Sequence, residues 1–152
     1  MRPTRHTSDS RLFFDWLEIA ARDLLAARLL MEQGQCLDIA AFHCQQCLEK
    51  AFKAYLLDQT GVLPDGHNLT WLCRQAKKYD KGFHQWFDES ADLNQCYVET
   101  RYPADIEREY TYKMVKNFYR MAKEMYQYIF AEIDREFDRR EKAEEDAPFY
   151  RP

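Results

Sequence analysis

The chain contains few residues that interrupt helices. Its 152 residues include four glycines and five prolines, and three of the prolines, Pro3, Pro148 and Pro152, lie near the two ends. Pro64 and Pro103 are the only prolines inside the chain. A β fold with many tight turns needs more glycine and proline than this. The scarcity argues against such a fold and favours long helices.

The sequence also lacks long apolar runs. Charged residues interrupt every apolar stretch well before the roughly 20 residues that a membrane-spanning helix needs. The first residues, MRPTRHTSDSR, lack the apolar region of a secretory signal. We therefore expect a cytoplasmic protein without a membrane partner.

The cysteines do not follow the pattern of a disulfide framework, because there are five of them at scattered spacings. Cys44 and Cys47 have the C-x-x-C spacing that zinc and redox sites use. No second pair of cysteines or histidines at matching spacing completes a zinc site. We expect both side chains to pack in a core as small apolar groups, and we predict neither a metal nor a cofactor.

The excess of negative charge is confined to one segment. The net charge is −4, from 26 acidic and 22 basic residues. Residues 132–146 hold eight of the acids and four of the bases, which leaves 18 of each in the rest of the chain. The bulk charge therefore does not indicate nucleic-acid binding, and a phosphate site would have to be a local patch.

Apolar residues recur at steps of three and four in five segments, which is the spacing of the buried face of a helix. Helices are predicted at about residues 10–33, 37–59, 68–79, 83–97 and from 111 onward. The buried face of the fourth is expected to include Ala91, and that of the last to consist of Val115, Phe118, Ala122, Met125, Ile129 and Ile133. Gly34 and Gly61 are placed to end the first two helices, and Asn68 and Thr111 to begin later ones. The pattern predicts an all-α protein, an up-and-down bundle of four to five helices.

We expect one folded domain with a tail at each end. Its parts are a flexible N-terminus at 1–9, a helical bundle at 10–133, and a charged helical extension and tail at 134–152. The first helix is expected to begin near Ser10, with Ser8, Asp9 or Ser10 as its N-cap. In the extension, Glu136 and Arg140 have the spacing of an attractive pair on one helix face.

Three segments carry motifs that point to a family: AAFHCQQCLEKAFKAYL, GHNLTWL and YVETRYPAD. They resemble, in the same order, the Q-Q-x-x-E-K-x-x-K-A, H-x-L and Y-x-x-x-R-Y-P motifs of the HEPN family (higher eukaryotes and prokaryotes nucleotide-binding). The matching residues are Gln45, Gln46, Glu49, Lys50, Lys53 and Ala54, then His67 and Leu69, then Tyr97, Arg101, Tyr102 and Pro103. The resemblance covers about residues 10–133.

The resemblance implies a helical bundle that is commonly a homodimer and is often encoded beside a minimal nucleotidyltransferase, as in a toxin–antitoxin pair. One branch of the family cleaves RNA with an arginine and a later histidine that are separated by four to six residues. Here the positions after Arg101 that would hold this histidine are Ile106, Glu107 and Arg108. The ribonuclease motif is therefore missing, and we do not assign the catalytic activity of that branch.

Arg101 is the first candidate binding residue, because it is predicted to lie in a loop between helices. Its guanidinium suits a phosphate or a carboxylate of a ligand. An ion pair with Asp105 or Glu49 that holds the loop is the structural alternative. Tyr102, beside Pro103, either packs in a rigid corner or stacks on a nucleotide base.

Four further residues complete the candidate set. Lys50 lies one position away from the predicted Glu49–Lys53 pair and is a candidate for a ligand phosphate. His67 either caps a helix or donates to a ligand. Lys113 and Lys116 begin a basic stripe on the last helix, which either binds RNA or an acidic partner or is a solvated face.

Two functions of different classes follow from these residues. The first is a binding module for a nucleotide or for a partner nucleotidyltransferase, with Arg101 and Lys50 holding phosphate. The alternative is an RNA-cleaving HEPN toxin with a departed motif, in which His67 replaces the missing base. A purely structural adaptor that forms a dimer without a small ligand is a third reading.

Overall fold

The computed structural model describes residues 9–99, 103 and 108–146, and the described part is helical without strands. Its elements are α1 (Phe13–Gln33), α2 (Leu37–Thr60), α3 (Leu69–Lys77), the 3-10 helix η1 (Lys81–Trp86), α4 (Phe87–Asn94), α5 (Cys96–Glu99) and α6 (Tyr112–Glu145). The predicted all-α fold is confirmed. No helix within the described ranges is long and apolar enough to cross a membrane.

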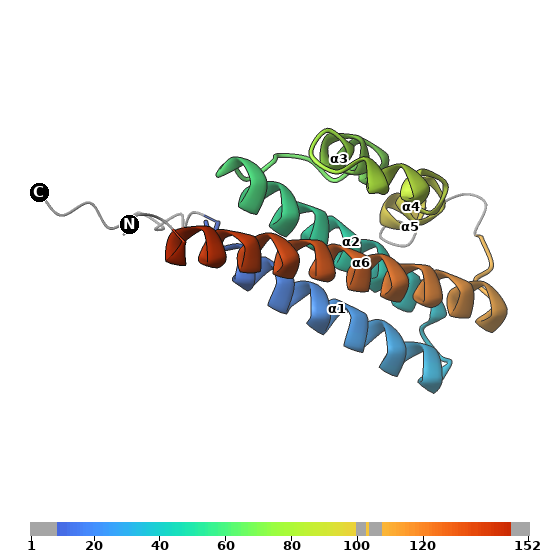
Figure 1. Cartoon of the computed structure of the whole chain (residues 1–152). Helices are drawn as coiled ribbons and strands as arrows, with labels where there is room; N and C mark the ends of the chain where they lie inside the picture. Colours follow the sequence, from blue (N-terminus) through green and yellow to red (C-terminus); the bar gives the residue numbers. More distant parts are fainter. Residues whose placement is uncertain (1–8, 100–102, 104–107, 147–152) are drawn as a thin grey trace, which may run out of the picture.

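The central element is α2. In Figure 1 the three long helices α1, α2 and α6 run side by side, and the short helices α3, α4 and α5 lie together on one side of α2. Neighbouring helices α1, α3, α5 and α6 all pack against α2. Residues 51–57 of α2 are consequently all buried, whereas a helix at a surface buries one stripe.

Local signals correctly placed several helix ends. Gly34 and Gly61 follow α1 and α2 in the left-handed conformation, with φ of 80° and 71°, where a side chain would be strained. The side chains of Asn68 and Thr111 each accept a hydrogen bond from the backbone N–H three residues later. Both residues are therefore the N-caps that were predicted for α3 and α6.

The predicted start of α1 is wrong by three residues. The helix begins at Phe13, and its N-cap, Leu12, makes no side-chain capping bond. The Ser10 hydroxyl instead accepts the Leu12 N–H (3.1 Å) and donates to the Asp15 carboxylate (2.6 Å), and the Trp16 indole donates to the Ser10 carbonyl. Ser10 therefore makes its hydrogen bonds before the helix begins and is not the N-cap.

The predicted fourth helix, 83–97, is three elements rather than one. It begins inside η1 and continues as α4 and α5. A 3-10 helix has about three residues per turn instead of 3.6, so the buried face shifts along the chain. Ala91, which was predicted on the buried face, is exposed, whereas Ser90 and Leu93 are buried.

The buried stripe of α6 follows its predicted positions. The predicted residues Val115, Phe118, Ala122, Met125, Ile129 and Ile133 are all buried. The helix continues without a break through residue 134 to Glu145. The expected Glu136–Arg140 pair is wrong, because Arg140 binds Asp58 at the end of α2 (2.9 Å) and Glu136 pairs with Arg139 (3.3 Å).

A polar cluster joins the turn before η1 to α6. Asp80 accepts the Gly82 N–H (2.8 Å) and the Tyr128 hydroxyl (3.2 Å), and Glu132 pairs with Arg135. Burial raises the pKa of Glu132, and a hydrogen bond to Asp80 adds to the rise. Burial acts to raise the pKa of Asp80 too, but hydrogen bonds from its neighbours outweigh it and lower that pKa.

This cluster predicts a pH-dependent difference between the protein and its Glu132→Gln variant. A carboxyl whose pKa is raised by folding stabilises the folded state most below its unfolded pKa, about 4.3, and this contribution is lost as pH rises. The variant lacks this loss. In thermal unfolding, the melting temperature of the variant minus that of the unaltered protein should therefore increase from pH 4 to pH 7. A difference that stays constant over this range would show that Glu132 does not titrate in this way.

Candidate polar site on helix α2

Although α2 is the central helix, it buries polar side chains. Gln45, Glu49 and Lys53 are at most 7% exposed. They lie at steps of four and share one face of the helix. Burying charged groups is costly unless each has a partner, so their environment decides whether the helix is stable.

Glu49 is the centre of the first group. Its carboxylate accepts hydrogen bonds from Nζ of Lys53 (3.2 Å) and from Nε2 of Gln46 (3.0 Å), and it contacts Nδ1 of His67 at 2.5 Å. His67 comes from the loop before α3, and its ring stacks on Tyr97 of α5, 5.2 Å between centroids and 11° from parallel. The Glu49 carboxylate therefore joins α2 to the loop before α3, and the ring of His67 links this group to α5.

Asp23 is the centre of the second group. This residue of α1 is 8% exposed, and its two oxygens contact Nδ1 of His43 (2.8 Å) and Nζ of Lys50 (2.5 Å). His43 and Lys50 are seven residues apart on α2, which places them about two turns apart on one face. The two groups adjoin through the neighbouring residues Glu49 and Lys50.

Both groups have the same design. A buried carboxylate holds a lysine and the Nδ1 atom of a histidine, and the side chains of His43 and His67 are 28% and 56% exposed. Within the described part of the chain, neither Nε2 atom has a hydrogen-bond partner. A carboxylate on Nδ1 fixes the orientation of an imidazole and leaves Nε2 to bind or exchange a proton.

Comparison with known proteins decides the family. The model of the HEPN domain matches residues 14–135. The chain belongs to the HEPN family. The match includes α1 except its first residue, α2 to α5 and most of α6, and with them every residue of both carboxylate groups.

Two solved structures share the fold of this HEPN protein. TT1696 from Thermus thermophilus has a TM-score of 0.70 and 24% identity, and the match covers 78% of this chain and 96% of that one. ST0689, an archaeal HEPN homologue, has a TM-score of 0.66 and 24% identity over 80% and 98% of the two chains. At this identity they show the fold alone. No curated protein matches the chain.

The structure divides the predicted binding residues of the HEPN protein between two surfaces. Lys50 and His67 lie in the adjoining groups on α2. Lys113 and Lys116 instead line a groove between α6 and Met31 of α1. His67 is not the cap of α3, because Asn68 is.

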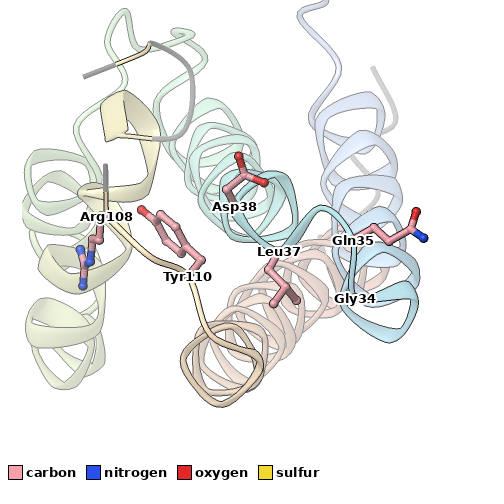
Figure 2. A pocket seen from close by; sticks show the side chains of 6 residues that line it. All are labelled: Gly34, Gln35, Leu37, Asp38, Arg108 and Tyr110. Carbon is pink, nitrogen blue, oxygen red and sulfur yellow. The ribbon is translucent and has the colours of Figure 1, made fainter. Parts of the chain in front are cut away.

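Arg101 and Tyr102 lie outside the described residues. The segment that follows them is described from Arg108, which donates to Gln95 (3.0 Å) and lies over the ring of Tyr110, 5.6 Å from its centroid. Figure 2 shows a surface pocket here, with Tyr110 between Arg108 and Asp38 of α2. The pocket places one cation and one carboxylate beside the start of α2.

Sequence reasoning missed Asp23 and His43 as site residues. A signal was present for Asp23, because it occupies a helix position between the buried Ala20 and Ala27. A carboxylate on the buried face of a helix requires a partner. The partners come from α2, so the sequence of α1 alone does not identify them.

The C-x-x-C pair is part of the core. Cys44 and Cys47 are fully buried, and burial is the main cause that raises the pKa of both thiols well above the ordinary range. A buried thiol with a raised pKa stays protonated and is a poor nucleophile and metal ligand. The packing interpretation is confirmed.

Proposed function

We propose that this HEPN protein is a binding module for a nucleotide, either free or presented by a partner minimal nucleotidyltransferase in a toxin–antitoxin-type pair. The observation that carries the proposal is the pair of imidazoles that buried carboxylates hold, together with Lys50, which shares the carboxylate of Asp23 with His43. Asp23 and Glu49 fix His43, Lys50 and His67 in place. Binding phosphate with prepositioned donors avoids the entropy of ordering them.

The aromatic ring of Tyr97 supports a nucleotide over a simple anion. Tyr97 already stacks on His67, next to the donors. Any nucleotide base can stack on an aromatic or imidazole ring, so the base of a nucleotide whose phosphate is bound here can stack on this pair of rings. Arg101 follows Tyr97 by four residues and is the candidate for a further phosphate contact.

Thermal-shift measurements with adenine and guanine nucleotides test this function. A ligand at ten times its dissociation constant should stabilise the protein by about 1.4 kcal/mol and raise the melting temperature by about 3–6 °C. The rise should disappear in Lys50→Gln, which keeps a donor for Asp23 but removes the charge, and in Arg101→Ala. Lys78→Gln, at the exposed residue that follows α3, is the matched control and should keep the full rise.

The Arg101→Ala variant distinguishes a role of Arg101 in binding from a role in holding the structure. A lower melting temperature for Arg101→Ala without ligand, and no rise with any nucleotide for the unaltered protein, would identify Arg101 as a structural residue. The nucleotide proposal would then be wrong. The same result would leave direct association with a nucleotidyltransferase as the binding function to measure.

The Glu49–His67 contact favours one alternative, RNA cleavage without the usual histidine. Nε2 of His67 would take the proton of a ribose 2′-hydroxyl, and Arg101 would stabilise the charged transition state. Incubating the protein with single-stranded RNA tests it. Cleavage lost in both His67→Ala and Arg101→Ala would support this activity, whereas cleavage that survives either change would exclude this site.

A further inference from the structure

A cleft lined mostly by phenylalanine lies between α1 and α6, two helices that run side by side in Figure 1. Phe13 and Phe14 of α1 line this aromatic cleft together with Phe130 and Phe137 of α6, and buried aliphatic side chains complete it. Its volume is about 140 Å³. Sites that enclose a whole small molecule are roughly 300–1,000 Å³, so this cleft suits one side chain of a larger partner.

Three of the four rings are open to solvent. Phe14, Phe130 and Phe137 are 60%, 47% and 39% exposed. The ring of Phe14 lies 4.2 Å from that of Phe13 and 6.4 Å from that of Phe137, measured between centroids. Contiguous exposed aromatic groups of this kind mark interaction surfaces. The face of each ring carries partial negative charge, which attracts a cation.

Among the described residues that line the cleft, Asp134 is the one polar residue. It follows Phe130 by four positions and precedes Phe137 by three, so it shares their face of α6. The Asp134 side chain is exposed and has no hydrogen-bond or ion-pair partner within the described ranges. A carboxylate beside aromatic rings is an environment that suits a guanidinium or an ammonium group.

Acidic residues outnumber basic ones around the cleft. Residues 129–145 contain seven acids and four bases, a net charge of −3. The arginines of this segment already have partners in the chain: Arg135 pairs with Glu132, Arg139 with Glu136 and Arg140 with Asp58. Glu141, one turn beyond Phe137, is exposed and has no such partner in the part of the chain that the structure describes. A basic group of a partner would therefore meet carboxylates that no arginine of this chain occupies.

We propose that the aromatic cleft binds an arginine side chain of a partner protein, within a basic segment that also carries apolar residues. The guanidinium lies over the ring faces and donates to the Asp134 carboxylate. The exposed rings of Phe14 and Phe130 contact the apolar neighbours of the arginine, and Glu141 pairs with a second base of the segment. Arginine fits better than lysine, because its guanidinium is planar, weakly hydrated and stacks on aromatic rings.

The charge of the cleft argues against RNA as its occupant, because phosphates would approach the acidic half of α6. The residues that line the cleft also differ from those of the polar groups centred on Asp23 and Glu49. The inference therefore does not rest on the nucleotide site, and either proposal can fail without the other.

Fluorescence polarisation of labelled peptides with the full chain tests the inference. The probe is a fluorescein-labelled peptide of about twelve residues, with two arginines seven positions apart, as Asp134 and Glu141 are, and leucines between them. The control peptide has citrulline in place of both arginines, which keeps the shape of the side chain and removes its charge. We expect the arginine peptide to bind at least about tenfold more tightly than the citrulline peptide.

Variants of the protein locate the binding. Asp134→Asn should weaken binding of the arginine peptide by about two- to fivefold and leave that of the citrulline peptide unchanged. Phe130→Leu/Phe137→Leu keeps apolar side chains but removes two ring faces, and we expect a loss of about the same size. Asp92→Asn and Tyr79→Leu, at exposed positions outside the cleft, are the matched controls and should bind like the unaltered protein. Circular dichroism melts show whether each variant is folded.

Three results would overturn the inference. Equal binding of the two peptides would show that the rings hold apolar side chains only. Binding of the arginine peptide that neither cleft variant weakens would place the peptide elsewhere on the protein. No binding of either peptide at about 1 mM protein would exclude this kind of partner. If sedimentation then shows self-association that Phe130→Leu/Phe137→Leu weakens, a second copy of the chain covers the cleft instead.

Discussion

Replacing Glu49 by alanine should destabilise the folded protein by about 3–5 kcal/mol. The change removes the carboxylate that holds Lys53, whose side chain is 9% exposed, and leaves its charge buried without that partner. It also removes the contact that orients His67. Urea denaturation followed by circular dichroism measures the loss.

A double variant separates the cost of an unpaired charge from the value of the pair. Glu49→Leu/Lys53→Met replaces both charges with apolar groups of similar size, and we expect a stability within about 1–2 kcal/mol of the unaltered protein or above it. Glu124→Ala, which breaks the exposed pair with Arg120 on α6, should cost less than about 1 kcal/mol. Equal losses for Glu49→Ala and Glu124→Ala would contradict the buried pairing.

Replacing Phe83 by alanine should cost about 3–5 kcal/mol as well, for an apolar reason. Its ring is fully buried in η1 and lies 4.7 Å from the ring of Tyr55, 6.0 Å from that of Phe52 and 5.2 Å from that of Tyr128. Truncation leaves a cavity between α2 and α6 that these rigid rings fill poorly.

The matched control for Phe83 is Tyr79→Ala in the turn that precedes η1. Tyr79 is 52% exposed, so its truncation should cost less than about 1 kcal/mol in the same urea experiment. A loss for Phe83→Ala below about 2 kcal/mol would show that the short helices can collapse onto α2 and close the cavity.

The proposed binding site and the stability of the fold depend on the same contacts. Asp23 and Glu49 are needed to compensate buried or half-buried lysines, and they also hold the imidazoles that the proposed function uses. Variants that test function must therefore keep the carboxylates. For that reason Lys50→Gln is more informative about binding than any change at Asp23.

Features that depend on one or two turns of helix were predictable from the sequence. The stripe of α6, the glycines after α1 and α2, and the caps Asn68 and Thr111 were predicted correctly. Each depends on residues within about four positions of one another, because helical periodicity and capping are local. The fourth predicted helix was wrong, because a change from about 3.6 to about three residues per turn shifts the buried face.

Only the tertiary structure decided the partners of charged groups that lie far apart in the sequence, whereas the Glu49–Lys53 pair, four positions apart on α2, was predicted from its spacing and is present at 3.2 Å. Lys50 binds Asp23, 27 positions away, Glu49 contacts His67, 18 positions away, and Arg140 binds Asp58, 82 positions away. The sequence determined by itself that the protein is a helical bundle of the HEPN type, because periodicity, caps and motifs depend on residues that are close to one another in the chain. Which carboxylate holds which cation depends on how the helices pack, since burial makes the nearest opposite charge in space the necessary partner.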